Sequence, residues 1–67
     1  MSVAKVTEIS ASSPVSFDDA VKIGIARANK TLEGISGAWV SEMKVDVADG
    51  QVSAYRVNMK VTFVLTD

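Results

Sequence analysis

The sequence of 67 residues contains no cysteine and no histidine. Disulfide bonds are therefore excluded, and so are the usual zinc, copper and iron sites, which depend on thiolate or imidazole ligands. Nucleophile pairs of the Ser-His or Cys-His kind are excluded for the same reason. The four glycines, at positions 24, 34, 37 and 50, fit neither a dinucleotide-binding nor a phosphate-loop spacing. We therefore expect a protein that is not an enzyme.

Strong charge and long apolar runs are also missing. The net charge is −1 with the charges scattered, so the chain has no basic surface for nucleic acid. No apolar run is long enough to cross a bilayer, and we expect no cleavable leader at the N-terminus. We predict neither a nucleic-acid nor a membrane partner, and a cytoplasmic location, with which the absence of cysteine is compatible.

Apolar residues, in contrast, are abundant. They make up 48% of the chain, and the mean hydropathy is +0.24. A domain of this size buries only about 60% of the surface of its unfolded chain, and is marginally stable alone. One short helix and a hairpin cannot hide so many apolar side chains between them. We therefore expect the protein to associate with copies of itself.

The clearest pattern is the alternation of apolar and polar residues from Tyr55 to Leu65. A period of two predicts a strand with one buried face. Weaker alternation over residues 3–10 predicts a first strand, and the serine- and proline-containing residues 10–14 predict a turn. The inward positions of the last strand are Tyr55, Val57, Met59, Val61, Phe63 and Leu65.

A helix is predicted between these strands. Ser16 can cap its N-terminus, and two aspartates follow in the first turn, where the helix dipole favours negative charge. An apolar stripe continues to Leu32, and Gly34 is placed to end the helix in the left-handed conformation. Gly24 lies inside the helix, where glycine costs about 1 kcal/mol, so we expect another backbone to approach closely there. The stripe comprises Phe17, Val21, Ile25, Ala28 and Leu32.

A second strand, roughly Ala38 to Val47, is joined to the last strand by the turn sequence Asp49-Gly50. A two-residue turn pairs Trp39 with Lys60 and directs Trp39 away from the helix. A three-residue loop shifts the pairing by one and turns Trp39 inward. A bulge partway along the second strand would reconcile the two registers. The element order is β-α-β-β in one domain, residues 1–67.

Four side chains are candidates for a binding function. Trp39, the single tryptophan, is either a core or subunit-interface aromatic or a stacking platform for a small flat ligand. Arg56, on the polar face of the last strand, is either solvated or salt-bridged, or a donor to a ligand or neighbouring subunit. Glu42 and Asp46 are expected to face away from Trp39. They would form an intersubunit salt bridge or, where oxygen ligands converge at a symmetry axis, bind a hard cation.

The whole chain resembles the dodecins, small bacterial and archaeal flavin-binding proteins. The resemblance implies an α+β fold, in which a three-stranded antiparallel sheet wraps around one helix. It also implies a hollow homododecamer that stores riboflavin, FMN or FAD without catalysis. The matching segments are Ser12-Ser13-Pro14-Val15-Ser16-Phe17, Ala26-Arg27-Ala28, Lys30-Thr31-Leu32 and, most specifically, Tyr55 to Leu65, which is similar to the family pattern Tyr-Gln-Val-x-x-x-Val-x-Phe-x-Leu.

The resemblance also points to a flavin site. Flavin-binding dodecins stack the isoalloxazine ring on a tryptophan and hydrogen-bond it with a glutamine of the last strand. An ungapped alignment places these positions on Gly37 and Arg56. Trp39 lies two residues beyond Gly37, about 6.5–7 Å along the same strand face, and is either a displaced platform or an interface aromatic. The alternative is a dodecin-like shell that does not bind flavin, and is structural or binds a cation such as calcium.

Overall fold

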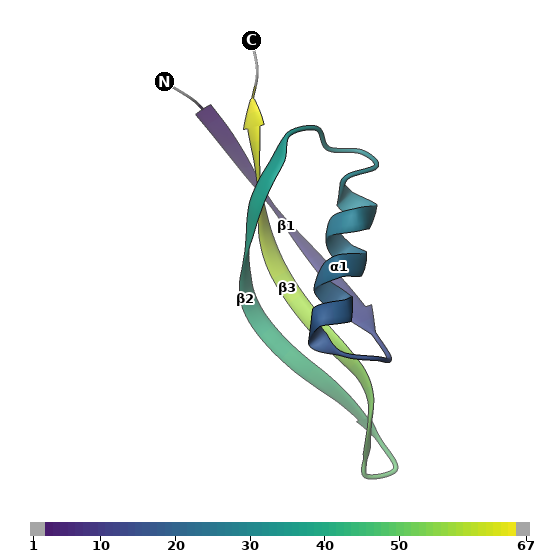
Figure 1. The fold of residues 1–67 in the computed structure, drawn as a ribbon. Coiled ribbons are helices and arrows are strands. Elements are labelled where there is room, and N and C mark those ends of the chain that lie inside the picture. Colours follow the sequence, from purple (N-terminus) through teal and green to yellow (C-terminus); the bar gives the residue numbers. More distant parts are fainter. Residues whose placement is uncertain (1–2, 66–67) are drawn as a thin grey trace.

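Four elements follow one another in the predicted order: β1 (Val3–Ser13), α1 (Phe17–Ala28), β2 (Ile35–Ala48) and β3 (Gln51–Leu65). They are seen in a computed structural model that describes residues 3–65. The strands form one antiparallel sheet in the order β1-β3-β2, and α1 lies across one face of it (Figure 1). The predicted β-α-β-β fold, with its three-stranded antiparallel sheet and single helix, is confirmed.

The alternation along β3 has the predicted effect. Val57, Met59 and Val61 are buried beneath α1, and Phe17 of the helix packs edge-on against Tyr55 with ring centroids 5.1 Å apart. The expected turn at residues 10–14 is wrong in its first part. The first strand continues to Ser13, which pairs with Tyr55, because β3 extends far enough to supply backbone partners.

Helix α1 begins as predicted and ends earlier. The Ser16 side chain accepts a hydrogen bond from the amide of Asp19 at 3.0 Å. The regular helix stops at Ala28, and short turns follow, in which the Leu32 amide still bonds to the carbonyl of Ala28 at 2.9 Å. Gly34 is left-handed as expected, with φ +77°, but it lies in the connection to β2 and does not cap the helix directly.

Gly24 allows α1 to approach the sheet closely, although through side chains rather than the expected backbone. A Cβ atom at this position would lie 2.6 Å from the Cε of Met59 and 3.0 Å from the Cβ of Ala11. Both distances are below the normal contact of two carbon atoms, so any larger residue requires a shift of the helix or the core. The glycine therefore sets the spacing between helix and sheet.

The β2–β3 hairpin has the two-residue turn. Asp49 and Gly50 both have positive φ, 53° and 75°, which is typical of a type I′ turn. Trp39 pairs with Lys60, as that register predicts. The hypothesised bulge in the second strand is also found, at Ser41 between the pairs of Val40 and Glu42, and the register shifts at two further points.

The domain is elongated, and much of it is uncovered. Its radius of gyration is 13.7 Å, where a compact domain of this length has about 11 Å. The β2–β3 hairpin extends past the N-terminal end of α1 (Figure 1), and every residue of β2 except Ile35 and Asp46 is exposed. The buried apolar residues are few: Ala20, Ala28, Val57, Met59 and Val61.

We expect Gly34→Ala to lower the free energy of unfolding by about 1–3 kcal/mol. The residue has a positive φ, and an added Cβ would lie 2.9 Å from the Val64 carbonyl oxygen, where the Gly34 carbonyl accepts from the Val64 amide at 3.0 Å. The matched control is Gly37→Ala, because a Cβ there has no neighbour within 4 Å. Thermal and urea unfolding at equal protein concentration measure both. Equal stability of the two variants would contradict this role of Gly34.

Candidate functional site

The face of the sheet opposite α1, called the outer face below, carries the candidate side chains. Its residues are identified by the register, since directly paired residues of neighbouring strands point to the same side. On β3 they alternate with the buried Val57, Met59 and Val61. The polar and aromatic members used below are Glu8, Ser10 and Ser12 on β1, Gly37, Trp39, Glu42, Lys44 and Asp46 on β2, and Arg56, Asn58, Lys60 and Thr62 on β3.

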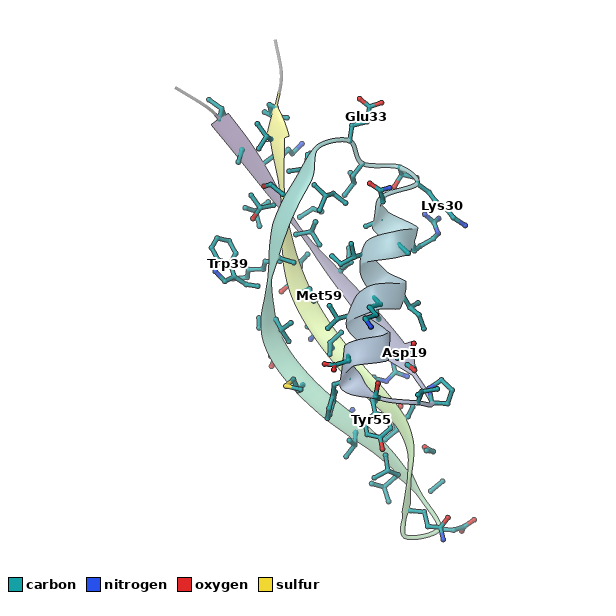
Figure 2. All side chains as sticks on the ribbon, viewed as in Figure 1. Asp19, Lys30, Glu33, Trp39, Tyr55 and Met59 are labelled. Atoms are coloured by element: carbon teal, nitrogen blue, oxygen red, sulfur yellow. The ribbon has the colours of Figure 1, made fainter. Side chains whose placement is uncertain are left out.

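Trp39 projects from the outer face into solvent. Its side chain is 63% exposed and points away from α1, beyond β2 (Figure 2). Lys60 is its partner on β3, and Glu8 is the partner of Lys60 on β1. Gly37, two residues earlier on the same face, pairs with Thr62 and has open space where a side chain would stand. The indole therefore borders a flat, open area.

A second cluster lies further along the outer face. The Nε of Arg56 donates to Asp46 Oδ2 at 2.9 Å in an exposed ion pair, and the Nδ2 of Asn58 donates to Glu42 Oε1 at 3.0 Å. Together with Lys44 these four side chains line a shallow pocket of about 330 Å³. Asp46 therefore has an ion-pair partner within its own chain, and the salt bridge between subunits stays a prediction.

The expectation that Glu42 and Asp46 face away from Trp39 is wrong. The bulge inserts Ser41 between Val40 and Glu42, so the strand gains one residue between the two pairs. Glu42 therefore pairs with Asn58 on the same face on which Trp39 pairs with Lys60. A strict alternation along β2 predicts the opposite, because each inserted residue reverses the face of those that follow.

The structure brings only part of the expected site together. Gly37 and Trp39 lie side by side on the outer face, as predicted from their spacing. Arg56 is four residues from Lys60, which faces Trp39, and this separation is about 13–14 Å by strand rise. Within one chain, Arg56 is therefore not a cross-strand neighbour of Trp39, and its guanidinium group is paired with Asp46.

Sequence reasoning missed Lys60 as a site residue. Its ammonium group is a donor directly across the strand from the indole, on the open side of the sheet. The signal was present, since the two-residue turn already pairs Trp39 with Lys60. Nothing in the local sequence distinguishes this lysine from a solvated one, and only the register gives it a partner.

The described part of the chain shows no preformed cation site and no membrane segment. Among residues 3–65, no three acidic side chains gather closely enough to hold a metal ion. Across the same residues, no helix has both the length and the apolar character that a membrane crossing requires. Glu42 and Asp46 would need further oxygen ligands from elsewhere to bind a hard cation.

Fold and outer face together define a small binding protein. The family model of the dodecins matches residues 3–66, and the chain belongs to the dodecin family. Dodecins are small flavin-binding proteins without catalytic activity. A search of the curated proteins found no match.

Solved structures agree with this assignment. The dodecin from Streptomyces davaonensis is 36% identical, with 98% of this chain and 97% of that one covered, at a TM-score of 0.94. The dodecin from Streptomyces coelicolor is 32% identical, with 98% and 94% covered and a TM-score of 0.93. A calcium dodecin from Mycobacterium tuberculosis, described as a calcium-chelating antigen with a novel calcium-binding site, is 31% identical, with 96% and 91% covered and a TM-score of 0.82.

Proposed function

We propose that the protein binds a flavin on the outer face of its sheet and holds it without catalysis, as a homo-oligomer. The observation that carries this proposal is the exposed indole of Trp39 beside the open area above Gly37. A flat aromatic ligand can stack on an exposed indole, which contributes on the order of 1 kcal/mol beyond the area buried. Membership of a flavin-binding family supports the choice of ligand.

Each residue near the indole has a separate task in this proposal. Gly37 leaves room for the isoalloxazine ring, because it has no side chain and no atom lies within 4 Å of the place where a Cβ would stand. Lys60 and Thr62 offer donors to the polar edge of the ring or to the phosphate of FMN or FAD. Arg56, which the ungapped alignment places at the family's glutamine position, lies four residues along β3 from Lys60, the partner of Trp39, and would serve a flavin held by a neighbouring copy.

Assembly is part of the same proposal. The family implies a homo-oligomer, and we propose the hollow homododecamer. Exposed apolar side chains along β2 and the small number of buried residues support self-association, since small domains with a limited core are usually completed by other copies. Stacking between copies would also double the aromatic surface available to each flavin.

We expect purified protein to quench riboflavin fluorescence at saturation, and Trp39→Ala to weaken the affinity about fivefold or more, which corresponds to ~1 kcal/mol. Trp39→Phe should retain part of the affinity. The control is Val40→Ala, which changes the neighbouring residue on the opposite face of the sheet. Titration with riboflavin and FMN measures all four proteins. No quenching at micromolar protein, or unchanged affinity of Trp39→Ala, would refute this site.

The second candidate function is cation binding. It is favoured by the similarity to the calcium dodecin of Mycobacterium tuberculosis and by the carboxylates of Glu42 and Asp46 on the open outer face. Both carboxylates already accept hydrogen bonds, from Asn58 and Arg56. A calcium ion would have to displace these donors or find further oxygen ligands in a neighbouring copy.

Because both carboxylates are already occupied by these donors, we expect the melting temperature to be the same in calcium and in chelator. A cation that binds only the folded protein would instead raise the melting temperature by mass action. Differential scanning fluorimetry at fixed protein concentration makes the measurement. Glu42→Gln and Asp46→Asn are the matched variants, since each removes one charge and keeps the shape. A calcium-dependent rise that either variant abolishes would establish the cation site instead.

A further inference from the structure

One row of paired residues on the outer face joins all three strands at the indole. Glu8 of β1 pairs with Lys60 of β3, and Lys60 pairs in turn with Trp39 of β2. Neighbouring strands lie about 4.8 Å apart, so the Cα atoms of the two outer residues are separated by roughly 10 Å. The row therefore places an acceptor, a donor and an aromatic platform next to one another across the sheet.

The two charged side chains of this row are free to bind a ligand. Glu8 and Lys60 are both exposed. Among the residues that the structure describes, the ion pair is that of Arg56 with Asp46, and the side chains of Glu8 and Lys60 do not bind each other. An exposed ion pair between them would in any case contribute at most about 1 kcal/mol. Little free energy is therefore lost when both groups turn to a ligand.

The neighbouring row provides a floor for a flat ring. Thr62 pairs with Val6 of β1 and with Gly37 of β2. Gly37 has open space above it, and Val6 is 47% exposed, so the floor consists of short and largely apolar groups. A ring that stacks on the indole on the side of Gly37 would stand over this floor. The long side chains of Lys60 and Glu8 rise along the same border and can reach its edge.

The chemistry of the pair fits the polar edge of an isoalloxazine ring. This imide edge presents a carbonyl oxygen, an N–H group and a second carbonyl oxygen in succession, so it needs a donor and an acceptor side by side. The ammonium group of Lys60 only donates, and the carboxylate of Glu8 only accepts. A phosphate group beside Lys60 would instead be repelled by the carboxylate of Glu8.

We propose that Lys60 and Glu8 together bind the imide edge of the ring that stacks on Trp39. Lys60 donates to a carbonyl oxygen of the ring, and Glu8 accepts from its N–H group. The pair makes the site selective for flavins over flat aromatic rings that lack this edge. The inference rests on the flavin binding proposed above, and it assigns Lys60 to the ring rather than to the phosphate of FMN or FAD.

Lumiflavin tests the contact of Glu8, because it has the ring without the ribityl chain or phosphate. We expect the protein to bind lumiflavin about fivefold or more tightly than lumiflavin methylated at the imide nitrogen, which has no hydrogen to donate to Glu8. Glu8→Ala should weaken the binding of lumiflavin and abolish this preference. Equal affinity of the unaltered protein for the two rings, or a preference that survives in Glu8→Ala, would overturn the proposal.

Lys60→Met tests the donor, since it removes the charge and keeps a long side chain. The loss should be the same, about fivefold, for lumiflavin, riboflavin and FMN in fluorescence titrations. The matched control is Lys44→Met, the same change on the same face opposite Arg56, which should leave lumiflavin binding unchanged. A loss confined to FMN would assign Lys60 to the phosphate and overturn the proposal, as would unchanged binding of lumiflavin. Both outcomes leave flavin binding itself intact, whereas an unaltered protein that binds none of the three ligands would refute flavin binding and this inference with it.

Discussion

The burial of one face of β3 is the constraint on which the rest of the structure depends. This strand is central, with β1 on one side and β2 on the other, and its Val57, Met59 and Val61 are covered by α1. Gly24 lets the helix come near the sheet, because a Cβ there would lie 3.0 Å from the Cβ of Ala11 and would also displace the flexible end of Met59. Once these side chains are buried, Arg56, Asn58, Lys60 and Thr62 must face outward, since a slip of one residue would exchange the two faces of the strand.

The bulge at Ser41 determines which residues of β2 lie on each face of the sheet, because the inserted residue reverses the alternation beyond it. On one side of it, Trp39 shares the outer face with Lys60; on the other, Met43 shares the helix side with Val57. The Ser41 hydroxyl donates to the Asn58 carbonyl at 3.0 Å and holds the inserted residue against β3. One additional residue thus allows the strand to place Trp39 and, beyond the bulge, the polar side chains of Glu42, Lys44 and Asp46 on the outer face, while Met43 and Val45 lie on the opposite face.

Local signals in the sequence were sufficient to predict which strands and helix form. They were not sufficient to predict where each one ends, or on which face of the sheet each side chain lies. The alternation of β3, the Ser16 cap and the Asp49-Gly50 turn each depend on neighbouring residues only, and each was predictable. The extension of β1 to Ser13 depends on pairing with Tyr55, and serine and alanine give no strand signal of their own. Leu32 belongs to the apolar stripe in the sequence, but it lies beyond the end of α1 and lines the pocket between α1 and β1. The stripe therefore extends further along the chain than the helix does. The faces of Glu42 and Asp46, and the pairing of Arg56, depend on a bulge whose position the pattern alone did not fix.

The two faces of the sheet have different physical requirements, and this difference separates assembly from ligand binding. On the helix side, the β2–β3 hairpin leaves apolar side chains such as Met43 and Val47 exposed, and the proposed association with other copies would cover them. On the outer face Glu8, Glu42 and Asp46 are interspersed with Lys44, Arg56 and Lys60, so this face carries no large charge of one sign. Two such faces can approach each other with little repulsion, and each would bring an exposed indole. Copies joined through their helix sides would therefore keep their outer faces free to meet around a flat ligand, a geometry that a single copy cannot provide.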